Sequence, residues 1–166
     1  MKPMNSGRIV RTYTQRIEAS PDRVFPLLCP VREAEWLDEW ADAAEMIHTA
    51  SGVAEDGCVF RTRHPGGVET IWMITHHDPA ARVVEFTRVT PGLAATRLRI
   101  DVDPLDVDTS AVRVAYTVTP LGPEGAKFVA DHFRDYRFRD DMRWWEDSMN
   151  HWLHHGTCLR VAEQGA

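Results

Sequence analysis

The sequence predicts an α+β fold in which one antiparallel sheet of about seven strands is covered by a long C-terminal helix. Two observations indicate this. Between residues 44 and 120, short runs of alternating apolar and polar residues are separated by turns rich in Gly, Pro and Asp. Beyond residue 125, the apolar residues recur at helical spacing. We expect the 166 residues to form a single domain, with its core between about residues 8 and 156.

The first predicted strand is Arg8–Glu18, where apolar residues fall on one face of an extended chain. A helix is expected next, because Ser20 is a favourable N-cap and Pro21 suits the first helical position. Pro30 is expected to end this helix. A second short helix is predicted over Val31–Leu37, which contains good helix formers.

Six further strands are predicted in the middle of the chain. Because the turns between them are short, they should form an antiparallel meander with one wet and one dry face. The predicted strands are Ala44–Ser51, Cys58–His64, Val68–His77, Val83–Thr90, Leu93–Val102 and Ala111–Pro120.

The C-terminal helical region has an apolar stripe that changes direction. Val129 and Phe133 lie on one side at 100° per residue, whereas Met142, Trp145 and Met149 lie nearly opposite. One straight helix cannot bury both stripes against one sheet, so a break or kink is predicted near residues 135–138. Gly156 is expected to end the helix as a C′ cap.

Composition and charge exclude several classes of function. The chain has 19 basic and 25 acidic side chains, a net charge of −6, and no basic block, so nucleic-acid binding is not expected. The longest apolar run, Val24–Val31, contains two prolines and is far too short to cross a bilayer, so no membrane insertion is expected. Met1–Gly7 lacks the apolar segment of a secretory signal. These features together favour a cytoplasmic protein.

No metal or cofactor is expected. The three cysteines, Cys29, Cys58 and Cys158, have no CxxC spacing and form an odd set, which argues against a zinc site or a disulfide framework. A reactive Cys29 is the alternative to three structural thiols. His151 and His155 are four residues apart, but no HExxH signature accompanies them.

Several segments resemble one protein superfamily. Ile17–Phe25 is similar to the strand-to-helix entry of the START-like, or SRPBCC, superfamily, which includes birch-pollen-allergen-like proteins and polyketide cyclases and dehydrases. Leu28–Glu33, Gly57–Phe60 and Met149–Leu153 resemble a bacterial subgroup of it, together with Trp36, Trp40 and Trp72. The resemblance covers nearly the whole chain. It implies a helix-grip fold, in which a curved sheet wraps around the C-terminal helix and leaves a hydrophobic cavity.

The resemblance also implies that the inward face of each strand and the apolar stripe of the last helix line this cavity. The expected ligand is a small hydrophobic, aromatic molecule, since aromatic residues and a few polar groups make up the expected lining. The alternative is that these side chains only fill a core. The candidate ligand-binding residues are Trp36, His48, Phe60, Thr62, His64, Trp72, Ile74, Phe86, Arg88, Leu98, Tyr116, Met142, Trp145 and Met149.

Other functions stay open at this level. A polyketide cyclase or dehydratase is the main alternative, with His64 or His76 and Tyr116 or Arg88 as acid and base, but no catalytic residue is assigned. Arg88 either points inward to a ligand acid or an internal acid, or reaches solvent near Pro91. A protein-interaction module is the third class, and the sequence leaves open whether the protein forms a homodimer.

The six tryptophans are not evenly distributed. Four of them, Trp36, Trp72, Trp145 and Trp152, fall on elements or faces predicted to surround one space. Trp144 is predicted to face away from that space and to be a surface or interface residue.

Overall fold

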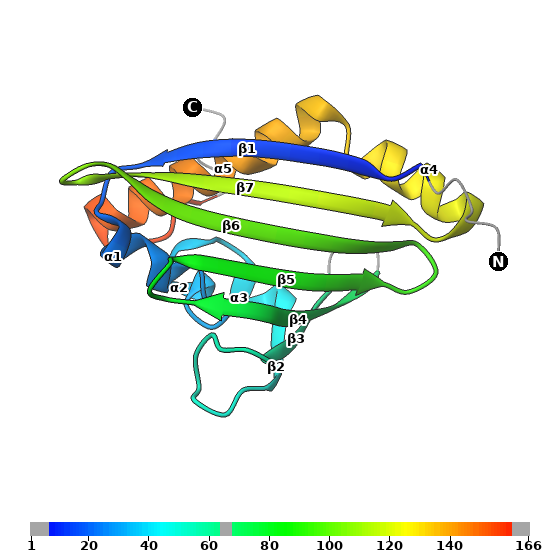
Figure 1. Ribbon diagram of the computed structural model, residues 1–166, viewed down its shortest axis with the longest axis horizontal. Helices are drawn as coiled ribbons and strands as arrows, with labels where there is room; N and C mark the ends of the chain where they lie inside the picture. Colours follow the sequence, from blue (N-terminus) through cyan, green and yellow to red (C-terminus); the bar gives the residue numbers. More distant parts are fainter. Residues whose placement is uncertain (1–6, 64–67, 161–166) are drawn as a thin grey trace.

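The computed structural model describes residues 7–63 and 68–160. Within these ranges, seven strands form one antiparallel sheet in the order β1-β7-β6-β5-β4-β3-β2 (Figure 1). The strands are β1 (Ile9–Ile17), β2 (Ala44–His48), β3 (Val59–Arg63), β4 (Glu69–Asp78), β5 (Val83–Thr90), β6 (Ala94–Asp106) and β7 (Thr109–Pro120). The helices are α1 (Pro21–Val24), the 3₁₀ helix η1 (Phe25–Leu27), α2 (Glu33–Trp36), α3 (Trp40–Ala43), α4 (Gly122–His132) and α5 (Asp135–His155).

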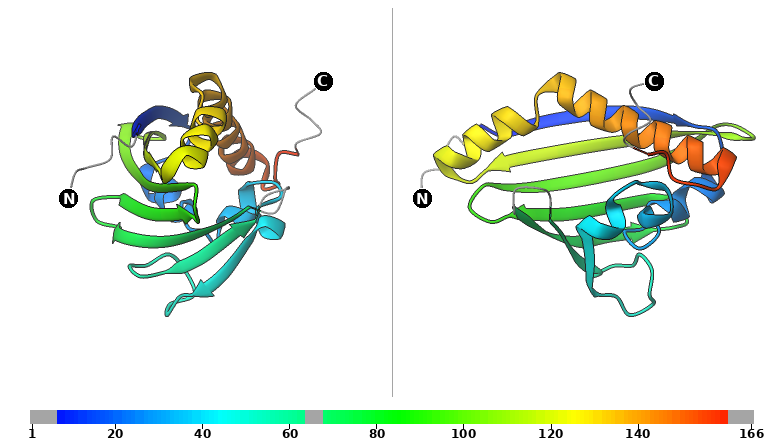
Figure 2. Two further views of the ribbon diagram at one scale, coloured as in Figure 1. Left: turned by 90° about the vertical axis from the view of Figure 1, so that its right-hand side faces the viewer. Right: turned by 180° about the vertical axis from the view of Figure 1, so that it is seen from behind.

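Strands β2 to β7 follow one another in the sheet as a meander, and β1 pairs with β7 from Ile9↔Val118 to Ile17↔Ser110. The sheet is strongly curved, and all the helices lie on its concave side (Figure 2). The fold predicted from the sequence, an α+β helix-grip arrangement with a long C-terminal helix, is therefore confirmed.

Several element boundaries differ from the sequence-based expectation. The first helix is shorter, because one α-helical turn passes into a 3₁₀ turn that contains Pro26. A third short helix, α3, was not expected. Strand β6 runs through Pro104 to Asp106, where a register shift in its pairing with β7 accommodates the proline.

Helix α5 is fastened to the edge strand β1 by side chains. The Asn150 side chain accepts a hydrogen bond from the Glu18 amide (2.8 Å) and donates one to the Arg16 carbonyl (3.0 Å). Glu146 accepts from the Arg16 amide (3.1 Å). Gln15, which is only 1% exposed, donates to a backbone carbonyl of α5 at 2.9 Å. These bonds fix α5 along one side of the sheet.

The predicted break in the C-terminal helix is confirmed, at Phe133 and Arg134, just before the expected residues. Arg11 on β1 donates from Nε to the Phe133 carbonyl at 3.0 Å and so satisfies a carbonyl at the end of α4. On α4, Gly125 lies against the backbone of Leu93, where a Cβ atom would collide with the Leu93 carbonyl oxygen. Gly156 ends α5 in the left-handed conformation (φ 71°), as predicted.

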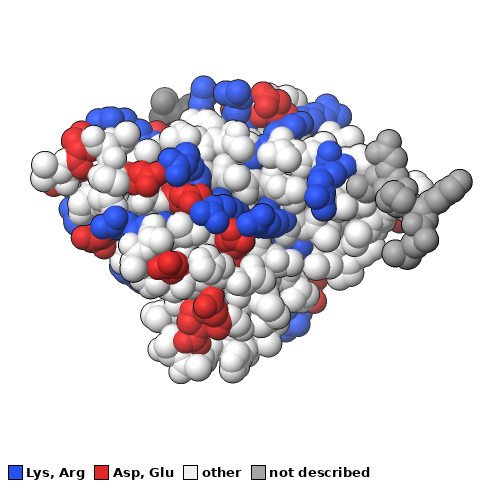
Figure 3. Space-filling model, viewed as in Figure 1, with Lys and Arg blue, Asp and Glu red and all other residues white. Residues whose placement is uncertain are grey.

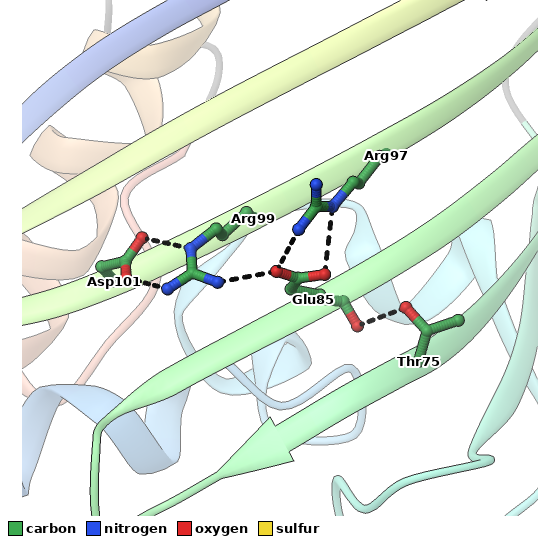
Figure 4. A network of polar contacts seen from close by, with 5 residues as sticks. All are labelled: Thr75, Glu85, Arg97, Arg99 and Asp101. Atoms are coloured by element: carbon green, nitrogen blue, oxygen red, sulfur yellow. Dashed lines mark hydrogen bonds and ion pairs between the residues drawn. The ribbon is translucent and has the colours of Figure 1, made fainter.

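The convex face of the sheet carries a ladder of ion pairs. Arginine side chains form a row across this face (Figure 3). Glu85 lies between Arg97 (2.5 Å) and Arg99 (2.7 Å), and Arg99 also binds Asp101 at 2.6 Å (Figure 4). Pairs on an open surface each contribute little to stability. This face is therefore the solvated side of the sheet, and the concave side is where a site must be sought.

The bonds between Asn150 and β1 predict a measurable contribution to stability. Asn150→Ala should lower the free energy of unfolding by about 1–3 kcal/mol, because two hydrogen bonds across the α5–β1 contact are lost. Urea denaturation would measure this. The control is Asp147→Ala at an exposed position of the same helix, since Asn and Asp have similar helix propensities. Equal effects of the two substitutions would contradict this account of how α5 is held.

Candidate functional site

A cavity of about 590 Å³ lies between the concave face of the sheet, the two C-terminal helices and the segment joining α2 to α3. This volume is in the range of sites for drug-sized molecules. The sheet wall consists of Val68, Thr70, Trp72, Arg88, Thr90 and Tyr116. The helix wall consists of Phe128, His132, Phe133, Arg137, Phe138, Asp141, Met142, Trp144 and Trp145. The third wall consists of Leu37, Asp38, Glu39, Trp40 and Ala43.

Strand register brings the residues of the sheet wall together. Trp72 on β4 is directly opposite Arg88 on β5, and two residues further along each strand the Thr70 and Thr90 hydroxyl groups form a hydrogen bond at 2.9 Å. The Trp72 indole nitrogen donates to the Thr62 hydroxyl (2.9 Å), which fixes the orientation of the ring. This part of the sheet wall, formed by β4 and β5, is therefore a preorganised surface with one aromatic side chain, one guanidinium group and two hydroxyl groups.

Arg88 lies inside a cage of three aromatic rings. Its guanidinium carbon is 4.9 Å from the ring centre of Trp72, 5.2 Å from that of Tyr116 and 5.3 Å from that of Phe133. Among the residues that the structure describes, none forms a hydrogen bond or an ion pair with this guanidinium. Burial lowers the pKa of Arg88 from its usual value. Of the two orientations that the sequence left open, the structure shows the inward one.

Tyr116 on β7 adds a phenol hydroxyl to the sheet wall. Its ring packs against Phe133 and Phe138, with ring centres 6.1 and 5.6 Å away. Burial raises the pKa of Tyr116, and the nearby charge of Arg88 opposes this shift. The phenol is thus neutral at physiological pH, and it borders the cavity as a polar group.

The rim of the cavity is formed by the helix break and the α2–α3 segment. At the helix break, His132 stacks on Phe128 with ring centres 4.2 Å apart. Asp141 faces the cavity from α5, and desolvation raises its pKa, although Arg137 opposes the shift. On the opposite side, Glu39 has the left-handed backbone conformation (φ 65°), which is strained for a residue other than Gly.

The C-terminal end of the described chain packs onto the same α2–α3 segment. Arg160 forms an ion pair with Asp38 at 2.7 Å, and the Cys158 thiol donates to the Glu35 carbonyl at 3.1 Å. This contact brings the residues after α5 next to the rim and restrains the third wall of the cavity.

Five of the sequence-predicted site residues line the cavity. They are Trp72, Arg88, Tyr116, Met142 and Trp145. Thr62 lies directly behind this lining, since it holds the Trp72 indole, and Phe60 stacks on the Trp72 ring with centres 5.4 Å apart. These two residues support the cavity wall from the core.

Five other predicted residues are placed elsewhere. Trp36 is completely buried, donates to the Leu27 carbonyl (3.0 Å), and packs edge-to-face on Trp145. Ile74, Phe86, Leu98 and Met149 belong to the hydrophobic core. Their apolar alternation was correct, but alternation does not separate a side chain that fills the core from one that borders an opening.

The expectation that His48 faces the cavity is wrong. His48 is exposed, because a register shift between Met46 and His48 in the β2–β3 pairing interrupts the alternation. His64 lies outside the described residues. The prediction that Trp144 faces away from this space is also wrong, since the residue is half-buried and lines the rim.

Sequence reasoning missed most of the rim. Leu37–Trp40, Phe128, His132, Arg137 and Asp141 were not among the candidates. Phe133 was noted only as part of a helical stripe. The strongest available signal was the change in stripe direction, because a helix break opposite a curved sheet exposes side chains from both helical segments to one space.

A smaller cavity of about 230 Å³ lies on the other side of Trp40. It is lined by Pro30, Val31, Ala34, Trp40, Ala41, Ala44, Met46 and Phe60. The Trp40 indole donates to the Pro30 carbonyl at 2.8 Å and packs edge-on to Phe60. Trp40 therefore forms a partition between the two cavities.

A buried acid lies near the cavity on α2. Glu33 is 5% exposed, and burial raises the pKa of its carboxyl group to about 8. Its charge would raise the pKa of Tyr116, so the two groups lie within electrostatic reach of each other. At neutral pH, Glu33 is mainly protonated.

Metal ligands are not assembled in the described ranges. No group of three or more His, Cys, Asp or Glu side chains is arranged there to hold a metal ion. Cys29 and Cys58 are buried free thiols, and burial raises the pKa of Cys58 to about 11. In the described part of the chain, none of the helices is long and apolar enough to span a membrane.

A curved antiparallel sheet that grips a long C-terminal helix around an internal cavity defines the class of helix-grip proteins. The chain belongs to the family described as polyketide cyclase / dehydrase and lipid transport, whose model matches residues 8–143. Among curated proteins, none matches this chain by sequence.

Solved structures with the same fold are distant in sequence. Norcoclaurine synthase from Thalictrum flavum, in complex with dopamine and hydroxybenzaldehyde, matches with a TM-score of 0.67 and 17% identity, over 89% of this chain and 88% of that one. The Zhui aromatase/cyclase from Streptomyces sp. R1128 matches with a TM-score of 0.61 and 15% identity, over 92% and 99% of the two chains. At this level of identity, the likeness concerns the fold.

The raised pKa of Glu33 predicts how stability depends on pH. In the unfolded chain this carboxyl loses its proton near its usual pKa of 4.5, whereas in the folded protein it keeps the proton up to about pH 8. Between these values the folded state binds one more proton, so its contribution to stability is complete below pH 4.5 and is lost as pH rises to 8. The slope is about −1.4 kcal/mol per pH unit.

Glu33→Gln should remove this slope, so the variant loses less stability than the wild type between pH 5 and pH 8. Urea denaturation at both pH values would measure it. Glu35→Gln on the same helix is the control, because its pairing with Arg32 lowers the pKa of Glu35 and keeps it charged across this interval. An unchanged slope in Glu33→Gln would contradict the assignment of a buried neutral acid.

Proposed function

We propose that the protein binds a small hydrophobic ligand with an aromatic portion in the 590 Å³ cavity between the sheet and α5. The observation that carries the proposal is the composition of the cavity walls. Six aromatic side chains other than histidine come from the two C-terminal helices and the α2–α3 segment, and Trp72 and Tyr116 come from the sheet. Flat rings that surround a volume of this size favour a flat apolar ligand.

The geometry of the sheet wall supports the same proposal. Trp72 is held by its hydrogen bond to Thr62 and by stacking on Phe60, so its cavity-facing surface is fixed before any ligand arrives. A preorganised wall lowers the entropic cost of binding. The family match to polyketide cyclases, dehydrases and lipid transport proteins is consistent with a ligand that is largely apolar.

The second candidate function is a cyclase or dehydratase reaction in the same cavity. Tyr116, Arg88 and Asp141 on the cavity walls favour it, because they supply a neutral phenol, a cation and a carboxyl group. A cyclase or dehydratase mechanism with histidine as the acid or base receives less support. His76 is exposed, His48 is exposed at the β2 bulge, and His132 at the rim is the imidazole nearest to the cavity in the described ranges.

Ligand binding predicts a response to a neutral apolar probe. N-phenyl-1-naphthylamine should bind the wild-type protein with a rise and a blue shift of its fluorescence, because its rings enter an apolar space. Ala43→Phe should weaken binding by about tenfold or more, since the added ring occupies cavity volume. Ala126→Phe adds the same ring at an exposed position on α4 and should leave the affinity unchanged.

The probe experiment distinguishes a cavity that is open to a ligand from a core that is filled by side chains. If the wild-type protein gives no fluorescence change, the proposed function is wrong. If Ala43→Phe and Ala126→Phe weaken binding equally, the probe binds elsewhere and the proposed location is wrong. Circular dichroism spectra of both variants would verify that the fold is retained.

A further inference from the structure

We propose that the ligand of the cavity carries an acidic group, such as a carboxylate, which pairs with the guanidinium of Arg88. This inference rests on the proposed function and specifies the chemistry of the ligand. It makes Arg88 the anchor that orients the ligand, with the acidic end at the sheet wall and the apolar body toward the helices.

The first argument concerns uncompensated charge. Arg88 lies on the cavity wall, and no carboxylate in the described part of the chain is within ion-pair distance of it. On the rim, Asp38 pairs with Arg160, and Arg137 is the cation that acts on Asp141. Glu39, the third carboxylate of the rim, forms no ion pair with Arg88 in the described part of the chain. A guanidinium on a largely apolar wall is stabilised when an anion or hydrogen-bond acceptors balance its charge. An acidic ligand provides that balance.

The second argument concerns the direction of the hydrogen-bond donors. Among the described residues, Ser148 Oγ is the only fully buried side-chain nitrogen or oxygen without a hydrogen-bond partner, so the Arg88 nitrogens are not fully buried. The unpartnered guanidinium nitrogens of Arg88 are therefore in contact with open space, and the space they border is the cavity. A guanidinium group carries five N–H donors and no acceptor. The partner that this arrangement fits is a group with acceptor oxygens.

The neighbouring hydroxyl groups strengthen this preference. Thr70 and Thr90 share one hydrogen bond, so one of the two hydroxyl hydrogens remains available to donate. Thr90 is two residues from Arg88 on the same strand and the same face of the sheet, and both residues line the cavity. Arg88 and this pair form a corner rich in donors, which is complementary to the two oxygens of a carboxylate.

The third argument concerns the aromatic cage. Trp72, Tyr116 and Phe133 surround the guanidinium at 4.9–5.3 Å from their ring centres, and they come from β4, β7 and the helix break. Cation–π contacts stabilise the charge and restrict the rotamers of Arg88. These contacts do not satisfy the N–H donors of Arg88, because a ring face is not a conventional hydrogen-bond acceptor. The cage therefore holds a donor group in position for a ligand.

A matched pair of small aromatic molecules tests this inference. 2-Naphthoic acid is ionised at pH 7.5, whereas methyl 2-naphthoate has the same rings and no charge. Isothermal titration calorimetry would give both affinities. The wild-type protein should bind the acid about tenfold or more tightly than the ester, because charge-assisted hydrogen bonds to Arg88 form only with the acid.

Arg88→Met should remove this preference. The variant keeps an unbranched side chain of similar length, so the ester should bind within about threefold of its wild-type affinity, whereas the acid should lose about tenfold or more. Arg97→Met is the control, since Arg97 lies on the opposite face of the sheet in the ion-pair ladder. That variant should retain the wild-type preference for the acid.

The outcomes separate this inference from the proposed function. If the ester or N-phenyl-1-naphthylamine binds the wild-type protein and the acid binds no better than the ester, the acidic ligand is wrong and the apolar cavity remains. If none of the three compounds binds, the proposed function itself is wrong. If Arg88→Met does not fold, the comparison of acid and ester on the wild-type protein still tests whether the cavity prefers an acidic ligand. Arg88→Gln is then the second variant, and it should also lose the preference for the acid.

Discussion

The attachment of α5 to one edge strand is the constraint on which the cavity depends. Asn150, Glu146 and Gln15 join the helix to β1 by polar bonds, and these bonds place it along one side of a curved sheet. The inward side chains of β4 and β5 are therefore left facing a space instead of a helix. On the far side, Trp36 and Trp145 pack edge-to-face and join α2 to α5, which closes one end of that space.

The break between α4 and α5 gives the cavity its rim. A continuous helix would direct Phe133 and Phe138 to different sides, whereas the broken one places both against Tyr116. The hydrogen bond from Arg11 to the Phe133 carbonyl holds the break over the sheet. The same element thus supplies the aromatic cover of Tyr116 and one ring of the cage around Arg88.

Two ionisable groups near the cavity are accommodated in opposite ways. Glu33 avoids the cost of a buried charge by keeping its proton, and this raises its pKa to about 8. A guanidinium group keeps its proton at all physiological pH values, so Arg88 remains charged and is surrounded by ring faces instead. Glu33 therefore fits a structural role in the core, whereas the proposed recognition of an acidic ligand rests on the caged cation beside the cavity.

The sequence predicted the fold well and the site only in part. Strands such as Val83–Thr90 were predicted accurately because alternation and turn residues are local signals, and the helix break followed from the change in stripe direction. The rim was missed because Leu37–Trp40 and Asp141 reach the cavity through tertiary packing, which has no periodic signature. The prediction that His48 faces the cavity was wrong because a single bulge reverses the alternation of a strand. The inward orientation of Arg88 could not be predicted from the sequence, because the rings that surround it come from three elements far apart in the chain.

A crystal structure of the protein with 2-naphthoate tests the central claim most directly. The account predicts the carboxylate at about 2.7–2.9 Å from the Arg88 guanidinium, with the rings in the cavity between Trp72 and the helix break. A structure in which Phe133 and Trp145 fill this space, or in which Arg88 pairs with a carboxylate of the rim while naphthoate lies elsewhere, would contradict it.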